Sequence, residues 1–271
     1  MKAGLLQLTS TDDPASNLTA TRAMMWDAAG QGAEFILTPE VTNCVSVSRR
    51  HQQSVLCLEA DDPTLAGLRA EAAALEVWLS IGSLALQTDD PDGRFANRSF
   101  VINPAGDIVA RYDKIHMFDV EVSEAETYRE SAGYRPGNRA VMAQTPFGQL
   151  GLSICYDLRF AYLYRALAQA GANILLVPSA FSPVTGAAHW QPLLQSRAIE
   201  TGCYVLAAAQ TGDHGGRETY GHSMAVSPWG EVLLDAGTTK SVSIVDINPH
   251  AVSDARKRIA ALSHDRTFEG P

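Results

Sequence analysis

Cys155 is the residue whose position first suggests chemistry. It lies near the end of the apolar run in "GLSICYDLRF" (residues 151–160), ahead of a stretch of helical periodicity that ends at Gly171. A strand-to-helix turn of this kind lifts a side chain clear of the sheet, and the helix N-terminus favours a reactive thiolate. A buried, inert thiol is the alternative, because free cysteine is often buried. The position therefore predicts a nucleophile, provided that other groups assist it.

A thiol that attacks a carbonyl also needs a base and a donor for the oxyanion. Histidine is a familiar base for such a thiol, but among the histidines downstream, three were considered and none has a neighbourhood that singles it out. Their spacing also fits no familiar metal-binding pattern, so we expect no metal. These residues are His189, His214 and His222.

Two other charged residues stand at the ends of β-runs. Glu40 follows the strand-like "FILTP", and Lys114 lies in "IVARYDKIHMF". Each has an ordinary interpretation, since Glu40 could be an exposed loop carboxylate and Lys114 could extend to solvent. Glu40, Lys114 and Cys155, each at the carboxyl end of a β-run, nevertheless form a pattern that indicates one shared site.

The elements that must position these residues alternate along the chain between short apolar strands and helical stretches. Helices are expected at about 17–30 and 63–76, in two stretches that end at Gly171 and near Gly202, and from about Pro249. "SFVINPAGDIVARYDKI" predicts a hairpin within a chain that also contains helical crossovers, so the sheets should be mixed. Ten or more strands favour two packed sheets in one α/β domain that spans residues 1–271.

The composition limits the classes of partner. Hydrophobic residues make up 46% and charged residues 19%, and the formal net charge of −9 argues against nucleic acid and anionic membranes as partners. No apolar run approaches the roughly 20 residues of a membrane span, and no signal peptide is evident. The four cysteines contain no CxxC pair, so we expect reduced thiols and a cytoplasmic location.

With these motifs in their order, the chain resembles the nitrilase superfamily of carbon–nitrogen hydrolases over nearly its whole length. "TPEVTN", "DKIHMFDV" and "GLSICYDLRF" are similar to the glutamate, lysine and cysteine motifs of that family. "RAIETGCYVLAAAQ" and "YGHSMAVSPWGEV" extend the resemblance, and "CYVLAAAQTGDHGGRETYGHSM" is most similar to the Nit-type amidases.

The resemblance implies a four-layer α-β-β-α sandwich with two mixed sheets, which dimerises through its helices or assembles into a higher homo-oligomer. It also implies cofactor-free hydrolysis of an amide to an acid plus ammonia through a cysteine thioester. Glu40 is then the general base and Cys155 the nucleophile, while Lys114 and the backbone N–H of Tyr156 stabilise the oxyanion. Glu130, in "TYRES", matches a second glutamate of the family, with a surface carboxylate as the alternative.

The Nit-type resemblance further implies a small anionic amide as substrate, with deaminated glutathione preferred. Arg159 is the first candidate to bind the anion, Thr185 could add a hydroxyl, and Arg217 is a weaker candidate. Arg197 and Glu200 are expected to form an internal ion pair. The alternatives are hydrolysis of 2-oxoglutaramate, of an N-carbamoyl amide or of a nitrile, and, in a different class, a non-catalytic or redox-sensing thiol protein.

Overall fold

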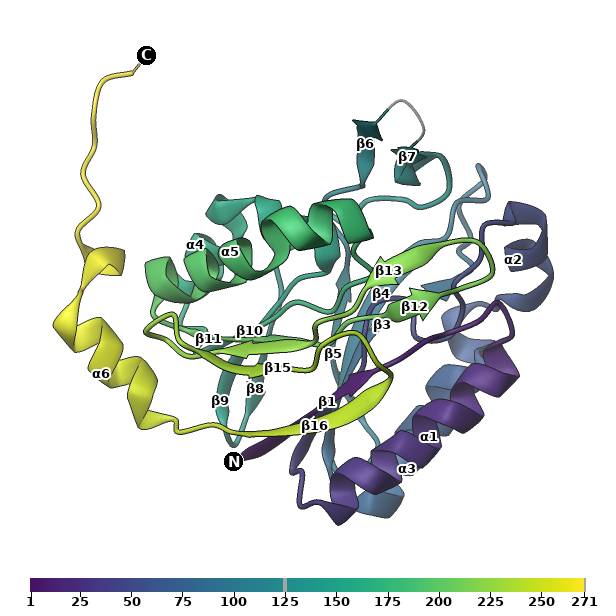
Figure 1. Cartoon of the computed structure of the whole chain (residues 1–271), viewed down its shortest axis with the longest axis horizontal. Coiled ribbons are helices and arrows are strands. Elements are labelled where there is room, and N and C mark those ends of the chain that lie inside the picture. Colours follow the sequence, from purple (N-terminus) through teal and green to yellow (C-terminus); the bar gives the residue numbers. More distant parts are fainter. Residues whose placement is uncertain (124–125, 271) are drawn as a thin grey trace.

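The computed structural model describes residues 1–123 and 126–270. Within them, two six-stranded sheets lie face to face (Figure 1). The first sheet has the strand order β16 (Ser241–Asp246), β1 (Lys2–Gln7), β2 (Phe35–Leu37), β3 (Trp78–Leu86), β4 (Ala96–Ile102) and β5 (Ile108–Asp113). The second has the order β15 (Val232–Asp235), β14 (Met224–Val226), β11 (Tyr204–Ala207), β10 (Ile174–Leu176), β9 (Gly148–Leu152) and β8 (Met142–Thr145).

Both sheets combine parallel and antiparallel pairs. In the first sheet β1, β2 and β3 are parallel, while β16, β4 and β5 join through antiparallel pairs. In the second sheet β9, β10 and β11 are parallel, and β8, β14 and β15 are added antiparallel. Because β5 is reached from β3 through two antiparallel pairs, it runs in the same direction as β2. The carboxyl ends of β2 and β5 therefore lie on the same side of the first sheet, where its strands end.

Helices cover the two outer faces of this sandwich. In Figure 1, α1 (Pro14–Gly30) and α3 (Pro63–Leu75) lie against the first sheet, and α4 (Ala161–Gln169) and α5 (Pro183–Thr201) lie against the second. One apolar core fills the space between the sheets, and a second, which includes Met25 and Leu68, fills the space under α1 and α3. The expected four-layer α-β-β-α sandwich with two mixed sheets is confirmed.

The starts of three helices follow directly from the sequence. α1, α3 and α5 each begin with proline, and the residue before it, Asp13, Asp62 or Ser182, accepts a hydrogen bond from a backbone N–H of the first turn. A capping side chain followed by proline satisfies or removes N–H groups that would otherwise lack partners. α5 ends at Gly202, whose left-handed φ of 59° few other residues adopt cheaply.

The shorter elements were not predicted. They are α2 (Arg49–Val55), the hairpin of β6 (Asp119–Ser123) and β7 (Glu126–Arg129), and the hairpin of β12 (Thr211–Asp213) and β13 (Glu218–Tyr220). Apart from β6, which alternates as DVEVS, their sequences are polar and lack the alternation of a half-buried strand, so tertiary contacts decide their form. The C-terminal helix was predicted and is α6 (His250–Arg258).

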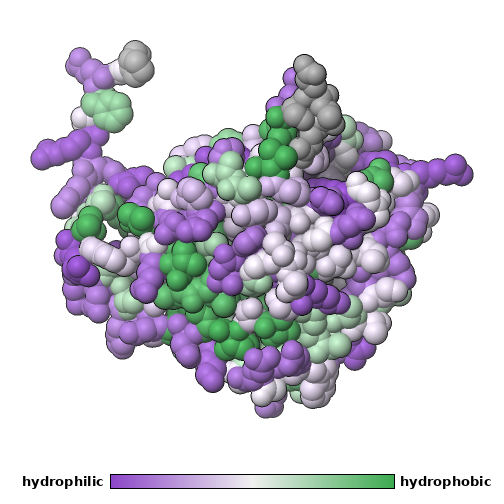
Figure 2. Space-filling view, viewed as in Figure 1, coloured by the Kyte–Doolittle hydropathy of each residue, from purple (hydrophilic) through white to green (hydrophobic). Residues whose placement is uncertain are grey.

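The surface carries one feature of note in Figure 2, where apolar side chains gather over β15 and β16, the edge strands of the two sheets. Among the described residues, no helix has both the length and the apolar character required to cross a membrane.

Candidate active site

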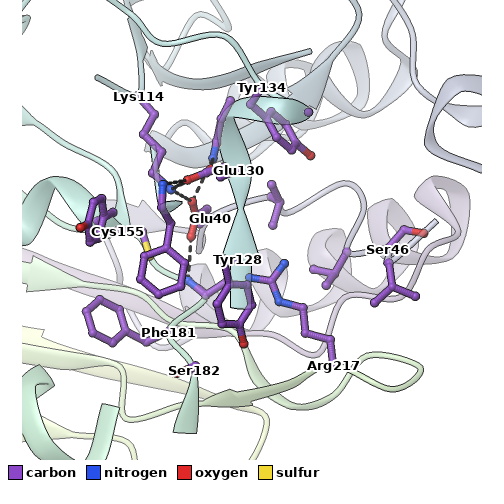
Figure 3. Close-up of a pocket in the computed structure, with 18 of the residues that line it drawn as sticks. Glu40, Ser46, Lys114, Tyr128, Glu130, Tyr134, Cys155, Phe181, Ser182 and Arg217 are labelled. Carbon is purple, nitrogen blue, oxygen red and sulfur yellow. Dashed lines mark hydrogen bonds and ion pairs between the residues drawn. The ribbon is translucent and has the colours of Figure 1, made fainter. Parts of the chain in front are cut away.

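Glu40, Lys114 and Cys155 converge where the carboxyl ends of β2, β5 and β9 meet (Figure 3). Their residues are only 4%, 2% and 8% exposed, respectively. Lys114 Nζ lies 2.9 Å from Glu40 Oε1. The first two side chains come from the first sheet and the third from the second, so the site exists only where the sheets face each other.

Glu40 is held by the chain that packs around its turn. A Cβ at Gly82 would lie 2.0 Å from the Thr38 carbonyl oxygen, so glycine allows β3 to approach the segment before Glu40. The next residue, Val41, has a φ of 48°, which is a strained conformation for a β-branched residue, and its N–H donates to Ser83 Oγ at 2.8 Å. The second oxygen of Glu40 accepts from the Ala180 N–H at 2.9 Å.

Lys114 is surrounded by acceptors. Its ammonium contacts both oxygens of Glu130, at 2.8 and 2.9 Å, in addition to Glu40. Glu130 lies at the start of a short 3₁₀ helix (Glu130–Ala132), and its Oε2 also accepts from the Phe118 N–H at 2.6 Å. The alternative of a surface carboxylate is thereby excluded for Glu130, whose side chain is 15% exposed.

Cys155 begins a 3₁₀ helix (Cys155–Arg159) rather than the regular helix expected at this point, and α4 starts only at Ala161. Its φ of 48° is left-handed, and its N–H donates to the Pro178 carbonyl at 2.9 Å. A non-glycine residue is held in this conformation only where its surroundings enforce it. The strained turn presents the thiol to the carboxylate of Glu40.

The charges of these groups determine which proton can move. Burial alone would raise the pKa of Glu40, but the charge and hydrogen bond of Lys114 outweigh it and place that pKa below its ordinary value. Burial alone would lower the pKa of Lys114, but Glu130 and Glu40 hold it well above the ordinary value. Burial, followed by the charge of Glu40, raises the pKa of Cys155. The resting site thus contains a neutral thiol beside a carboxylate, not the thiolate that a helix N-terminus was expected to favour.

Asn97 is a site residue that the sequence analysis missed. Its side-chain amide donates to Glu40 Oε1 at 2.9 Å and approaches Glu130 Oε1 at 3.5 Å, while its backbone carbonyl accepts from the Lys114 N–H. It holds the two carboxylates around the ammonium. Its position inside β4 carries no motif signal, because only the pairing of β4 with β5 brings it to the site.

The side chains lie at the inner end of a cavity of about 350 Å³, which is within the range of small-molecule sites. Tyr156 and Thr185 line it, as do Phe181 and Ser182. Within the part of the chain that the structure describes, the Tyr156 N–H donates to no backbone acceptor, so it is available for an oxyanion. Thr185 is 8% exposed, and its hydroxyl lies 3.1 Å from Ser182 Oγ.

Arg217 lies at the outer end of the cavity, on the β12–β13 hairpin, and its guanidinium lies over the Tyr128 ring at 5.9 Å (Figure 3). Lys114 and Arg129, the other cations of the wall, are paired with Glu130 and Glu121. Across residues 1–123 and 126–270, Arg217 is the cavity-lining cation with no carboxylate within ion-pair distance.

Arg159 does not line the cavity, although it was the first candidate from the sequence. Its guanidinium packs over the rings of Tyr156 and Phe181, and Nη2 lies 3.3 Å from His189 Nδ1. It therefore stands behind the aromatic wall that Tyr156 and Phe181 form. The expected pair of Arg197 with Glu200 is present at 2.7 Å.

No group of three His, Cys, Asp or Glu side chains among the described residues could hold a metal ion. The polar groups of the cavity are instead those of covalent catalysis: a thiol, a carboxylate base and a buried ammonium. This arrangement can attack a carbonyl carbon and stabilise the oxyanion that results.

A model of the carbon-nitrogen hydrolase family matches residues 2–257. The deaminated glutathione amidase of Synechocystis sp. (strain PCC 6803) is 39% identical over 265 residues, which cover 97% of each chain. The relationship thus extends along the whole of both proteins.

Solved structures agree with the fold. The crystal structure of the C. elegans NitFhit protein has a TM-score of 0.90 and 34% identity, covering 98% of this chain and 65% of that one. A mutant amidase from Nesterenkonia sp. AN1 has a TM-score of 0.79 and 26% identity, covering 96% and 98% of the two chains. In that structure acrylamide has been added to the active-site cysteine by Michael addition.

Proposed function

The chain belongs to the carbon–nitrogen hydrolase family and acts on amides, and from this premise we propose that its substrate is deaminated glutathione. The observation that carries the proposal is the cavity itself. Its inner end holds Glu40, Lys114 and Cys155, and its outer end holds a cation without a carboxylate partner among the described residues. A substrate with an amide at one end and an anion at the other matches both.

In the proposed mechanism, Glu40 takes the proton of Cys155 as the sulfur attacks the amide carbon. The lowered pKa of Glu40 and the raised pKa of Cys155 fit this sequence, because the proton stays on sulfur until attack begins. Lys114 and the Tyr156 N–H then stabilise the tetrahedral oxyanion. Glu130 and Asn97 keep the ammonium and Glu40 in place.

The intermediate collapses when Glu40 returns the proton to the departing nitrogen, which leaves a thioester on Cys155. Water, deprotonated by Glu40, attacks the thioester carbon, and the sulfur regains the proton as the acid departs. A primary amide releases ammonia in this way. The residues of glutathione are joined by secondary amides, so the same steps on deaminated glutathione release an amine instead of ammonia. An assay for ammonia alone would not detect this reaction.

We assign the anionic end of the substrate to Arg217 first. The inner end contains two carboxylates and one ammonium, so it carries net negative charge and repels an anion. Arg217 lines the same cavity outside this network of charges and can form a charge-assisted pair. Arg159 remains the second candidate, behind Phe181, and Thr185 adds a hydroxyl on that wall.

A homodimer in the cytoplasm completes the proposal. Large apolar side chains are exposed around the end of α5: Ile199 at 60%, Trp229 at 49% and Ile259 at 60%. Ile199 and Ile259 line one surface hollow, and Arg258 lies over the Trp229 ring at 3.8 Å. Exposed apolar side chains of this size are suited to contact with a second copy of the chain, and light scattering on the purified protein tests its association.

A panel of amides tests the function. Deaminated glutathione, 2-oxoglutaramate, an N-carbamoyl amide, a nitrile and neutral butyramide are incubated with wild type, and the acid product is measured by chromatography. The highest kcat/KM is expected for deaminated glutathione. A higher kcat/KM for another compound of the panel would assign that compound as the substrate in place of deaminated glutathione. No turnover in the panel, despite stoichiometric alkylation of Cys155, would favour a thiol protein without amidase activity.

The redox-sensing alternative has little support in the cavity. Cys44 lines the same cavity as Cys155 and would be the candidate for a resolving cysteine that forms a disulfide with it. Burial, together with the charges of Asp12 and Asp13, raises the pKa of Cys44 to about 12. A redox sensor needs an accessible, low-pKa thiol, so Cys44 is poorly suited to that role.

A further inference from the structure

Asp157 is a wholly buried carboxylate beside the site that the mechanism above does not use. Its Oδ2 accepts from the Ile154 N–H at 2.8 Å and from the Tyr112 hydroxyl at 2.6 Å. Its Oδ1 accepts from the His116 N–H at 3.0 Å and from the ring nitrogen Nδ1 of His116 at 2.6 Å. Four donors thus converge on one side chain.

The positions of these donors in the chain give the contacts their meaning. Tyr112 and His116 stand two residues before and two residues after Lys114, at the end of β5 in the first sheet. Asp157 and Ile154 flank Cys155, which follows β9 in the second sheet. One carboxylate therefore joins both sides of the lysine segment to the turn that carries the nucleophile.

A carboxylate suits this place because it only accepts hydrogen bonds, and all four partners can donate. Since Asp157 cannot donate, Nδ1 of His116 carries a proton, which leaves Nε2 to contact the Tyr162 hydroxyl. The His116 ring also stacks on Phe160, with 3.6 Å between ring centroids and 9° between planes. The ring is thus fixed on three sides.

The same carboxylate supports the strained turn at Cys155. While Oδ2 accepts from the N–H of Ile154, the residue before the thiol, the Asp157 N–H donates to the Ile154 carbonyl at 3.0 Å. A φ of 48° at Cys155 persists only where surrounding bonds enforce it. The arrangement of Asp157, Tyr112 and His116 is named here the Asp157 clasp.

We propose that the Asp157 clasp is a positioning device for the reaction, which sets the distance between the ammonium of Lys114 and the sulfur of Cys155. The proposal rests on the proposed function. Misplacement of reacting groups by about 1 Å can cost about 10²-fold in rate. Because the clasp does not touch the cavity wall at Arg217, its loss should lower kcat and leave KM nearly unchanged.

The test compares variants that remove single donors or the acceptor. Asp157→Asn replaces one acceptor by a donor that faces an N–H, so kcat should fall about 10²-fold, with KM within about threefold of wild type. Tyr112→Phe and His116→Phe should each lower kcat about tenfold, because each removes one hydrogen bond of the clasp. His116→Asn keeps a donor near Nδ1 and should retain kcat within about threefold.

Asp235→Asn is the matched control. Asp235 lies 2.8 Å from Nδ1 of His222, an Asp–His pair that contacts neither catalytic segment. Each kcat is normalised to the number of Cys155 thiols that iodoacetamide titrates in the folded protein, and each assay is run well below the melting temperature. A clasp that only stabilises the fold would lower the melting temperature and leave this normalised kcat unchanged.

The outcomes separate the two proposals. A wild type without amide turnover overturns the proposed function and this inference with it. If wild type is active and Asp157→Asn has normal kcat, the positioning role of the clasp is overturned and the proposed function stands. The same follows if kcat falls as far in His116→Asn as in His116→Phe. If Asp157→Asn does not fold, Tyr112→Phe and His116→Phe decide, and normal kcat in both overturns the proposal.

Discussion

The two ends of the cavity are built in different ways. At the inner end, Glu40 and Lys114 are almost inaccessible, and each has several hydrogen-bond partners. At the outer end, Arg217 belongs to a hairpin of two short strands. Its guanidinium lies over the face of the Tyr128 ring, which also lines the cavity. The inner end belongs to the core between the sheets, and the outer end belongs to connections that extend from it.

We infer from this difference that the inner end serves the reaction and the outer end serves the recognition of the substrate. Transition-state stabilisation needs donors that do not reorganise, and these are supplied by a buried network. Recognition of a remote charge requires only that a cation can reach it, and loops on a rigid scaffold are suited to that role. Changes at the inner end should therefore abolish turnover, and changes at the outer end should alter the choice of substrate.

The largest effect is expected at Cys155. Cys155→Ala and Cys155→Ser should reduce turnover of every amide by at least about a thousandfold, because the nucleophile is lost. Circular dichroism should show an unchanged fold. Cys57→Ser, which changes a thiol outside the cavity, is the control and should keep full activity. Substantial turnover in either Cys155 variant would mean that the thioester route is wrong.

Lys114→Arg should have the next largest effect, although it keeps the positive charge. The space around Lys114 Nζ is filled by Glu40 and Glu130, and a planar guanidinium cannot reproduce the point contacts of an ammonium. We expect kcat to fall by about 10²–10³-fold, as when an oxyanion donor is lost. Lys240→Arg, at an exposed position, serves as the control. Near-normal kcat would place Lys114 outside the reaction.

Arg217→Gln should act on KM more than on kcat, and only for anionic amides. Loss of a charge-assisted pair costs about 1.5–3 kcal/mol, or roughly 10–100-fold in KM. Arg159→Gln, measured in parallel, should have a smaller effect, because Arg159 does not line the cavity. The measurement is kcat and KM for deaminated glutathione and for butyramide. The reverse order of the two variants would assign the anion to Arg159.

The smallest effect is expected from mild acid. The pKa of Glu40 lies below 4.5, because the charge of Lys114 outweighs the effect of burial, so Glu40 stays ionised as the pH falls from 8 to 5. The kcat/KM for butyramide should be nearly flat over that window on the acid side and should decline only below about pH 4.5, as Glu40 takes up a proton. Circular dichroism at each pH excludes unfolding. A decline centred near pH 6 would identify a different base.

The order and type of the three residues that converge at the candidate site could be predicted from the sequence. Glu40, Lys114 and Cys155 each follow an apolar β-run, and a reactive side chain at the carboxyl end of a buried strand is visible as a local pattern. Two packed mixed sheets could also be predicted from the alternation of strands and helices, whereas the four-layer arrangement was implied by the family resemblance.

The partners of those residues were decided by tertiary structure. Asn97 is the second residue of β4 and Asp157 lies inside a motif already assigned to the nucleophile, so neither has a local signal of its own. The order of Arg159 and Arg217 was also decided there: Arg159 ranked first on the sequence, but Arg217 lines the cavity, whereas Arg159 packs over the Tyr156 and Phe181 rings.

Local patterns in the sequence were enough to predict which three residues would gather at the candidate site and which kind of element each would follow. The tertiary structure decided which atoms meet, that the thiol is neutral at rest, and that one buried carboxylate joins the two sheets at the site. The physical reason is one of range. Strand and helix patterns depend on neighbours a few residues away, whereas burial, charge and hydrogen bonding depend on segments from separate sheets that only the packed core brings together.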